Sequence, residues 1–426
     1  MRMSRKYRIA STLLLAVGCS SAHATLGIFE HGNGIVSMGM GGVSYSFAAE
    51  TTALGANPAH ALSLGDRYDV GIDVFHASAG STIRGNSLAP DRREKSDGRA
   101  LYMIPQGGIS KRLNADWALG LTVLSAGLGP DYDGSPYARF GGNPNRVSLG
   151  LASSGIVTAL AYRLTDDVAL GASLNTGYQV LEVKGLEFLA TDEASVSPDH
   201  VTNQGKDGVF TFGATLGFTW RITPWLTAGA AYRSKNYNAE HDEYRGLVAR
   251  GGKLELPAIY GGGFTMRPLP RLTVALEAQR YNYRDEASFR NGLDKFEQGE
   301  RLGGPDGPGF GFDDQNAYKL GVAYDLTPKL TVRGGFTYGT TIVTKDNTLF
   351  AALGCVPTKE QYSVGATYVW RDWEIAGFGH FTPRKKVRGE DSIPESFGGG
   401  EADIDDVVYA GGFSLGRRFG GSRPAP

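Results

Sequence analysis

The fold can be inferred from residues 209–221, because their side chains alternate in kind. This stretch reads Val209-Phe210-Thr211-Phe212-Gly213-Ala214-Thr215-Leu216-Gly217-Phe218-Thr219-Trp220-Arg221. The even positions are apolar, whereas the odd positions carry mainly Thr and Gly. Successive side chains of a β-strand point to opposite faces, so this pattern predicts a strand with one apolar and one small, polar face. In a soluble sandwich the polar face would carry long charged side chains. The pattern therefore favours a barrel turned inside out, with apolar side chains toward lipid and small or polar ones toward a lumen.

The same alternation recurs along the chain and returns directly after the turn at Thr223-Pro224. Fourteen segments can be counted, and bacterial barrels require an even number. They lie at about residues 68–76, 100–112, 117–126, 153–164, 167–181, 208–221, 225–235, 257–267, 271–283, 315–325, 329–340, 360–370, 372–382 and 405–419. The expected fold is thus an all-β, 14-stranded antiparallel transmembrane β-barrel.

The connections between these segments alternate in length, which predicts the topology. Short turns include Thr165-Asp166-Asp167 and Thr327-Pro328. Long connections lie at about residues 127–146, 182–207, 236–256, 284–314 and 383–404. We expect the short turns in the periplasm and the long loops outside the cell.

The composition agrees with an exported barrel. Gly makes up 61 of 426 residues, about 14% and twice the usual share, while only 20% of residues are charged. The hydrophobic fraction of 41% is too high for a disordered chain, and beyond the first segment no apolar run reaches the length of about 18 residues that a transmembrane helix needs. Only helices and closed barrels satisfy their backbone hydrogen bonds in lipid, so such a chain must close its sheet.

The first 24 residues are typical of an export signal. Four basic residues, from Arg2 to Arg8, precede an apolar run that ends at Cys19, and Ala22-His23-Ala24 is a cleavage site. The alternative is a lipoprotein signal, in which Cys19 would be lipidated. Cleavage after Ala24 leaves Cys355 as the one cysteine, so no internal disulfide is expected. The charge balance predicts no nucleic-acid partner, and no metal or cofactor motif is present.

Residues 25–66 do not alternate. They are rich in Gly, and Asn57 could cap a short helix that has Pro58 at its first position and Ala59 next. A segment of this kind can lie in the periplasm or in the lumen. Since a fourteen-stranded barrel leaves a lumen wide enough to leak, we expect a hatch, or plug, at 25–66, followed by the barrel at 67–419 and a short tail at 420–426.

Four stretches carry a resemblance to a known family. They are Asn57-Pro58-Ala59, Tyr102-Met103-Ile104-Pro105 with Trp117-Ala118-Leu119-Gly120-Leu121, Ala230-Ala231-Tyr232-Arg233-Ser234-Lys235, and Tyr362-Ser363-Val364-Gly365-Ala366-Thr367-Tyr368. The chain resembles the long-chain fatty-acid transporter family of FadL/TodX-type outer-membrane proteins. The resemblance implies a fourteen-stranded barrel with an N-terminal hatch in the bacterial outer membrane, passive uptake of hydrophobic compounds, and release sideways through a gap near the third strand.

The departures from the family concern the ligand more than the fold. The start Thr25-Leu26-Gly27-Ile28-Phe29 matches the family's start only loosely, and Tyr281-Asn282-Tyr283 stands where a Trp is usual. The resemblance implies Phe29 as a ligand contact. It also leaves open whether the ligand is a long-chain fatty acid or a hydrocarbon. We expect a monomer surrounded by outer-membrane lipid and lipopolysaccharide.

Two groups of residues are candidates for ligand binding. The first lies between the third and fourth strands and consists of Leu124, Leu128, Tyr132 and Tyr137, with Phe140 beyond them. These side chains either form an outer hydrophobic catch site or pack the loops together. The second group would bind a carboxylate, and consists of Lys319, Arg233 and Arg333, which point inward by parity. Each could instead pair with Asp69, Asp73 or Glu277 in a lumen network.

Two other functions are alternatives to a hydrophobic-solute channel. A general diffusion porin for polar solutes would have no need of a plug. An outer-membrane lipid hydrolase would use Gly412-Phe413-Ser414-Leu415-Gly416, but this motif lies inside the last strand and not at a strand-to-helix elbow, and no Ser/His pair can be assigned. The sequence therefore predicts a protein that is not an enzyme.

Overall fold

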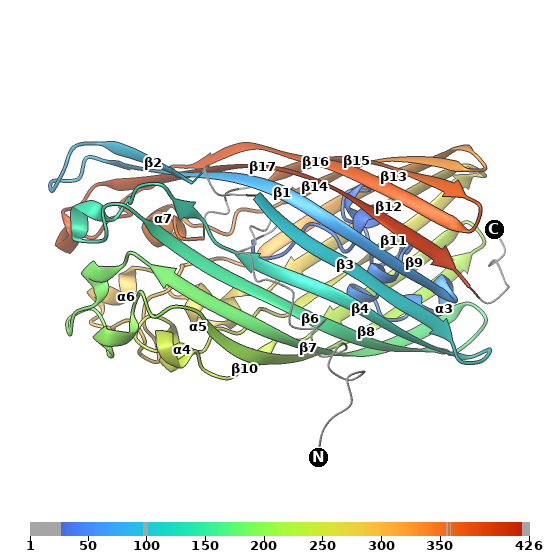
Figure 1. The fold of residues 1–426 in the computed structure, drawn as a ribbon, viewed down its shortest axis with the longest axis horizontal. Helices are drawn as coiled ribbons and strands as arrows, with labels where there is room; N and C mark the ends of the chain where they lie inside the picture. The colour runs from blue at the N-terminus through green and yellow to red at the C-terminus, as the bar shows by residue number, and fades with distance from the viewer. Residues whose placement is uncertain (1–26, 97–100, 355–356, 358, 420–426) are drawn as a thin grey trace, which may run out of the picture.

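The computed structural model describes residues 27–419, apart from 97–100, 355–356 and 358. The expected signal peptide and C-terminal tail lie outside the described residues. The strands form one sheet that curves into a cylinder (Figure 1), and every ladder between neighbouring strands is antiparallel. No helix among the described residues is both long enough and apolar enough to cross a membrane.

Fourteen of the described strands form the wall, and the expected fold is confirmed. They are β1 (Arg67–Arg84), β3 (Leu101–Arg112), β4 (Trp117–Leu128), β6 (Val147–Arg163), β7 (Val168–Lys184), β8 (Asp207–Thr223), β9 (Leu226–Arg233), β11 (Ile259–Leu269), β12 (Leu272–Tyr281), β13 (Gln315–Thr327), β14 (Leu330–Gly339), β15 (Glu360–Trp370), β16 (Trp373–Val387) and β17 (Glu401–Arg418). The barrel closes where β1 pairs with β17, from Arg67 opposite Arg418 to Arg84 opposite Glu401.

Several strands are longer than their alternating stretches predict. β1 continues eight residues beyond the expected end at residue 76, and β17 begins at Glu401 instead of 405. About 9–11 residues suffice to cross the membrane, so these extensions lie outside it. Residues 77–81 of β1 are all Ala, Ser or Gly, which hides the alternation while the ladder to β17 continues. The short strands β2 (Arg92–Ser96), β5 (Asp131–Tyr132) and β10 (Tyr237–Asn238) extend the sheet at the same end.

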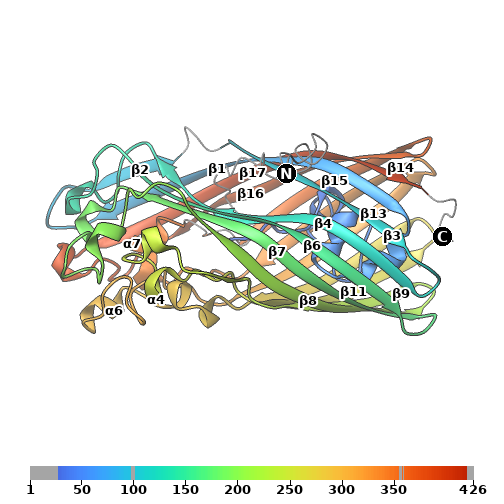
Figure 2. The same ribbon diagram turned by 60° about the horizontal axis from the view of Figure 1, so that its bottom comes forward.

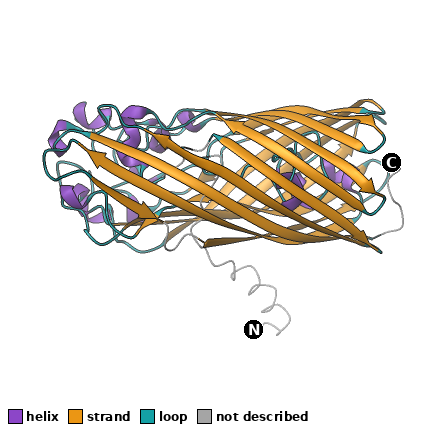
Figure 3. Ribbon diagram, turned by 90° about the horizontal axis from the view of Figure 1, so that it is seen from above, coloured by secondary structure: helices purple, strands orange, loops and turns teal. Residues whose placement is uncertain are grey.

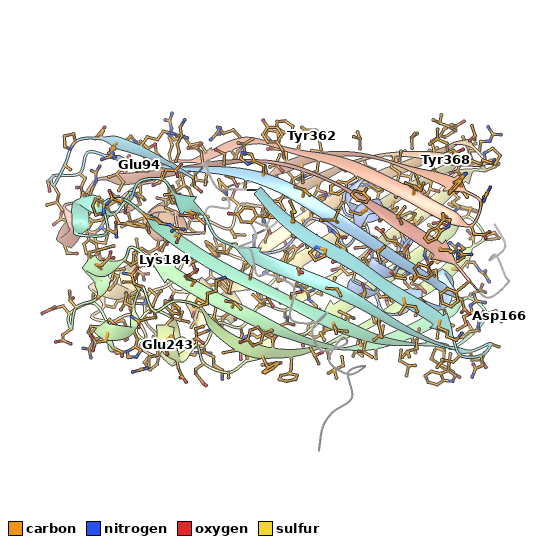
Figure 4. All side chains as sticks on the ribbon, in the orientation of Figure 1. Glu94, Asp166, Lys184, Glu243, Tyr362 and Tyr368 are labelled. Carbon is orange, nitrogen blue, oxygen red and sulfur yellow. The ribbon has the colours of Figure 1, made fainter. Side chains whose placement is uncertain are left out.

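The predicted faces agree with the exposure of the side chains. In β8 the five large apolar side chains at even positions are 39–68% exposed, whereas Thr211 and Thr215 are each 2% exposed. Tyr362 and Tyr368 stand on the outside of β15 toward its two ends (Figure 4). They are six positions apart, which is about 20 Å along the strand and about 15 Å in height at a tilt of roughly 40°, so both fit within a lipid-facing apolar band about 25 Å tall.

The two ends of the barrel differ. Short turns such as the one at Asp166 lie at one end (Figure 4), and the long loops lie at the other, where short helices gather (Figure 3). The helices of these loops are η2 (Ala138–Phe140), η3 (Glu187–Leu189), η4 (Pro198–His200), η5 (Asp242–Tyr244), α4 (Ala249–Gly252), η6 (Tyr283–Asp285), α5 (Ala287–Arg290), α6 (Asp294–Glu297), η7 (Lys345–Asn347), α7 (Thr348–Ala351) and η8 (Glu395–Phe397). Their apolar side chains form the largest buried cluster of the protein.

Residues 27–66, the N-terminal segment, lie within the barrel (Figure 2) and contain α2 (Ile35–Met38), η1 (Thr51–Gly55) and α3 (His60–Leu64). The carboxylate of Glu277 on β12 accepts hydrogen bonds from the backbone N–H groups of Ser44, Tyr45 and Ser46 at 2.8–2.9 Å. Because three donors of one segment converge on a single buried acid, β12 fixes the path of the segment across the lumen.

The expected helix at Asn57-Pro58-Ala59 begins later, at His60. The Asn57 side-chain oxygen accepts from the backbone N–H of Ala59 at 3.1 Å, as in a cap, while its amide nitrogen donates to the carbonyl oxygens of Tyr45 at 2.8 Å and of Phe218 on β8 at 2.9 Å. A Cβ atom on Gly217 would lie 2.3 Å from the Asn57 side-chain oxygen, so this close approach requires glycine in the wall. Asn57 therefore makes the expected capping bond at the turn that leads into α3, and it also anchors the N-terminal segment to β8.

Candidate functional site

An internal cavity lies between the N-terminal segment and the wall. Its empty volume is about 670 Å³, and it borders β4, β6, β7, β8, β9, β11 and β12. Three predicted site residues line it: Phe29, Leu124 and Arg233. Ile156, Val157, Leu256, Ile259 and Tyr281 complete most of its apolar surface. The charged residues of its lining are Arg233 and Glu30.

Arg233 is the cation of this lining and lies at the end of β9. Its guanidinium carbon lies 4.9 Å from the centre of the Phe29 ring, and Phe29 stacks on Tyr281 at 5.3 Å. The backbone N–H of Ile28 donates to the Tyr283 hydroxyl at 2.9 Å, which holds the start of the N-terminal segment beside these rings. Among the described carboxylates none forms an ion pair with Arg233. A partly buried guanidinium without an acidic partner can receive the acidic head of a ligand.

The other two predicted cations do not border this cavity. Lys319 is 4% exposed, lies opposite Glu277 in the ladder, and donates to the carbonyl oxygen of Gly42 at 3.0 Å. Arg333 stands near the short-turn end of β14, not in the half that faces the loops, and donates to the Thr367 hydroxyl at 2.7 Å. Parity placed both side chains on the inner face, but it gives no depth and does not reveal what the N-terminal segment occupies.

Three of the expected catch-site residues are fully buried in the loop packing. The Tyr132 hydroxyl donates to the carbonyl oxygen of Ala352 at 3.0 Å, and the Tyr137 hydroxyl donates to that of Leu349 at 2.7 Å. Leu128 is 0% exposed. These contacts join the loop at 129–146 to the loop at 340–359, which agrees with the packing interpretation for these three residues.

Phe140 differs from them, because it is only partly buried. Its ring lies 5.6 Å from that of Phe188 and 5.7 Å from that of Phe397, which come from two other loops. Phe296 of a fourth loop contacts Phe397 at 6.2 Å. Four loops thus contribute one phenylalanine each to a half-open aromatic cluster at the loop end of the barrel.

The sequence did not reveal a second apolar cavity, which lies among the loops. Its empty volume is about 550 Å³, and nearly all of its lining is apolar. It is lined mainly by Leu149, Leu181, Leu186, Leu189, Leu254, Leu302, Phe310 and Phe350. These residues come from strand ends and four loops, where no periodicity links them. The one available signal was the presence of leucines in otherwise polar loops.

The wall is interrupted at its third spanning strand. Residues 107–112 of β3 pair with residues 118–123 of β4, and the ladder ends there. Above this point β3 remains paired with β1, and β4 remains paired with β6 as far as Leu128. The backbone N–H of Gly127 donates instead to the carbonyl oxygen of Ile28 at 2.9 Å. The N-terminal segment therefore borders an opening in the ladder, close to Leu124.

The loop end closes this interruption again. The backbone N–H of Asp133 donates to the carbonyl oxygen of Lys95 on β2 at 3.1 Å, and that of Asp131 donates to the Ser96 hydroxyl at 3.1 Å. Among the residues that the structure describes, which exclude 97–100, the unpaired part of the wall thus has two limits, with the last β3–β4 pair at one side and the contacts of β2 at the other. We call this part of the wall the window.

The serine of the hydrolase-like motif lies in the middle of β17. Ser414 is paired with Gly71 in an unbroken ladder, and its hydroxyl donates to Glu50 of the N-terminal segment at 3.4 Å. Within the described part of the chain, no group of three or more His, Cys, Asp or Glu side chains is arranged to hold a metal ion.

A closed fourteen-stranded antiparallel barrel with an apolar outer face defines an outer-membrane transport barrel. The family model described as outer membrane protein transport protein (OMPP1/FadL/TodX) matches residues 20–415, and the chain belongs to this family. It has the fold of the family's outer-membrane transporters of hydrophobic compounds, and its location is the outer membrane.

Solved structures and one curated relative agree with this assignment. The toluene transporter TodX of P. putida has a TM-score of 0.69 at 18% identity, with 92% of this chain and 100% of that chain covered. A FadL homologue of Pseudomonas aeruginosa has a TM-score of 0.67 at 17% identity, with 93% and 99% covered. A 47 kDa outer membrane protein of Pasteurella multocida (strain Pm70) is 26% identical over 208 residues, 43% of this chain. The match spans 46% of that relative's length.

Proposed function

We propose that the chain is a passive channel for hydrophobic small molecules, which enter between the extracellular loops, occupy the internal cavity and leave sideways through the window. The observation that carries this proposal is the position of the internal cavity, which touches the N-terminal segment on one side and Leu124 beside the window on the other. Lipopolysaccharide hinders apolar solutes, and a water-filled pore offers them no favourable surface. An apolar route through the wall supplies one.

The first step of the route is capture among the loops. The apolar loop cavity and the half-open cluster around Phe140 support it, because both offer apolar surface at the end of the barrel that faces outward. Apolar pockets of a few hundred Å³ bury most of the surface of a small ligand. We assign Tyr132 and Tyr137 to the support of this region, since their hydroxyls hold two loops together.

The second step is binding in the internal cavity, where Arg233 favours an amphiphile with one acidic head. Phe29 and Tyr281 lie beside the guanidinium, while Val157 and Ile259 offer apolar surface for the tail. A fatty acid has this chemistry. A neutral hydrocarbon would gain the same apolar contacts and would leave the guanidinium unpaired, which is unfavourable in a site shielded from water.

The third step is release into the membrane. Paired strands leave no room for a side exit, because their backbone groups are bonded to one another along the whole ladder. The window lacks these bonds, and a contact of the N-terminal segment replaces one of them at Gly127. We propose that the segment also acts as the plug that prevents leakage through the lumen. The serine at position 414 has no catalytic role in this proposal.

Binding measurements with the purified full chain test the ligand assignment. The variant Arg233→Gln should bind a long-chain fatty acid about 10- to 100-fold more weakly, because it loses a charge-assisted hydrogen bond worth about 1.5–3 kcal/mol. Its affinity for a neutral hydrocarbon such as toluene should stay the same or rise, because no guanidinium is then left unpaired beside the bound hydrocarbon. Arg290→Gln is the matched control, since it removes one exposed cation of a loop at the same end and should change neither affinity.

Equal losses for the acid and the hydrocarbon would contradict the role of Arg233. Binding of the hydrocarbon alone by the parent protein would contradict the acidic ligand and retain the channel. Liposome swelling separates the channel from a diffusion porin, because sugars should not pass through the intact chain. Rapid swelling with sugars would favour the porin.

A further inference from the structure

The outer face of the sheet carries a positively charged patch beyond the membrane-spanning part of four neighbouring strands. The patch consists of Arg84 on β1, Arg93 and Lys95 on β2, and Arg384 and Lys386 on β16, and we call it the cationic ladder. β17 runs through it and contributes Glu401, Asp403 and Asp405. In Figure 1 these strands lie together where β1 and β17 extend past the body of the barrel.

Two aspartates of β17 hold the side chains of the cationic ladder in place. Asp403, 1% exposed, contacts Arg84 at 2.9 Å and Lys386 at 2.6 Å. Asp405, 3% exposed, contacts Arg93 at 2.6 Å and also pairs with Arg384. Each buried carboxylate therefore orients two cations that come from different strands. The cation side chains themselves remain 36–47% exposed.

The ion pair between Arg93 and Asp405 depends on a glycine of the strand that lies between them. Its side chain starts on β2 and crosses over β1 to reach Asp405 on β17. The crossing point is Gly80, where a Cβ atom would lie 2.5 Å from a guanidinium nitrogen of Arg93 and 2.8 Å from the Asp405 carboxylate. Any side chain at this position would obstruct the crossing.

The cationic ladder lies at the level of lipid headgroups. Phe381 and Tyr409 stack at 5.2 Å on the outer face and are 39% and 52% exposed, which places them in the outer aromatic girdle. Asp405 stands four residues farther out on the same face of β17, about 13 Å along the strand and about 10 Å in height for a strand tilted by roughly 40°. Cations at this height face the headgroup layer and not the hydrocarbon core.

The charges on this face do not balance. Five cations stand against three carboxylates, Glu401 included, and pairs of like charges converge on single aspartates. Like charges held together favour the binding of an anion between them. The outer face near β8 and β10 has the opposite character, because its groove is lined by Asp207, Glu240 and Asp242. These two parts of the outer face therefore differ in the charge that they present.

We propose that the cationic ladder docks a lipopolysaccharide molecule through the phosphate groups of its lipid A. The outer leaflet around the barrel supplies this anion at the height of the ladder, and guanidinium groups bind phosphate with two hydrogen bonds each. The bound lipid seats the strands β2, β1, β17 and β16 in the membrane. The inference is independent of the ligand that the barrel transports.

Binding of purified full-length barrel to lipid A in mild detergent tests the proposal, by native mass spectrometry or by titration. Phosphorylated lipid A should bind at least tenfold more tightly than enzymatically dephosphorylated lipid A. The double variant Arg93→Gln/Arg384→Gln should lose this preference. The matched control is Arg271→Gln/Lys329→Gln, which removes two cations from short turns at the other end and should keep it.

Three results would overturn the proposal: equal binding of the two lipids by the parent, an unchanged preference in the double variant, or full competition by millimolar inorganic phosphate, which would indicate a general anion site. Heat-modifiable migration on gels verifies that each variant is folded. If the double variant does not fold, Gly80→Val decides the question, because it blocks the path of Arg93 and removes no charge. Retention of the preference in Gly80→Val would also contradict the proposal.

Discussion

β8 and the upper half of β4 belong to the same wall but are stabilised in different ways. β8 pairs with β7 along residues 207–220, and on its other side with β9 at residues 215–223 and with β10 at residues 211–212, so strands bond both of its edges along most of its length. β4 is paired with β3 only at residues 118–123. Beyond them it depends on β6 and on a contact from Ile28 to Gly127.

The difference shows what a wall needs in order to be closed or open. A strand that other strands bond on both edges needs only the correct face toward lipid, and alternating side chains supply that. A strand with an incomplete ladder needs another part of the chain at its free edge. At β4 this part is the N-terminal segment, which also fills the lumen, so the same residues border the route inside the barrel and the window in its wall.

Among the changes that test this difference, removal of the N-terminal segment should have the largest effect, which is on ion conductance through the barrel. Deletion of residues 27–60 should leave a folded barrel, because closure depends on the strand ladders, and should open an ion-conducting pore. Planar-bilayer recordings measure it, with the full chain as the control. Unchanged conductance would place the barrier to ions outside this segment and would contradict its role as a plug.

A charge introduced on the lipid face of β8 should have the next largest effect, which is on the free energy of unfolding. Leu216→Arg, at mid-strand, should lower the free energy of unfolding by about 2–4 kcal/mol, and Phe212→Arg, nearer the interface, by less. Thr211→Arg lies beside Phe212 at the same depth but borders the internal cavity, and should cost least. Urea unfolding in lipid vesicles measures all three. Equal costs for Phe212→Arg and Thr211→Arg would contradict the assignment of faces.

The loops above the window should respond more weakly. Tyr137→Phe removes one hydrogen bond and leaves the Leu349 carbonyl group without that donor, which should cost about 1–2 kcal/mol in the stability of the loops. Hydrogen exchange of the loop at 340–359 measures the effect. Tyr237→Phe, at an exposed ring 54% open to its surroundings, is the control and should change nothing. A loss of the same size in both variants would refute the packing role of Tyr137.

Acidic residues in the loops should give a small pH dependence. Burial raises the pKa of the Glu286 carboxyl group above its ordinary value of 4.5, although Lys235 opposes the shift. The protonated form is therefore favoured in the folded loops, and their stability should be highest below pH 4.5 and decrease as the pH rises through the raised pKa.

Hydrogen exchange around α5 at several pH values, corrected for the intrinsic rate, measures this trend. Glu286→Gln should abolish the trend, because the amide does not titrate. Glu297→Gln, at an exposed position of α6, should retain it. A pH profile that is identical in the parent and in Glu286→Gln would assign the trend to other groups.

The sequence predicted the parts of the fold that local alternation determines. The faces of β8 were predicted because lipid and lumen select different side chains at successive positions of one strand. The outer ends of β1 and β17 were missed, because outside the membrane nothing maintains the alternation. The capping bond of Asn57 was predicted because it is local, although α3 itself begins only at His60. The contact of Asn57 with β8 was not predicted, because a contact between distant parts of the chain leaves no local pattern.

The candidate site was predictable to a smaller extent. Inward-pointing cations could be found by parity, but only the folded chain shows that Lys319 contacts Gly42 and that Arg233 lies over Phe29. The loop cavity and the window were not predicted from the residues themselves. The loop cavity joins residues from several loops, which no periodicity links. The window is a missing ladder between two strands whose side chains both alternate normally.

A reversible closure of the window tests the central claim most directly. If the register of the paired part continued, Ile104 would lie opposite Ala126. Cysteines at these two positions, in a Cys355→Ser background, can be bridged with a short thiol-reactive linker. Lys111→Cys/Leu119→Cys, a directly paired position of the same two strands, is the control. The measurement is uptake of a labelled long-chain fatty acid by cells that produce each variant. Bridging at the window should lower uptake at least tenfold, whereas bridging of the control should not. Equal uptake with the window bridged would contradict release through the wall.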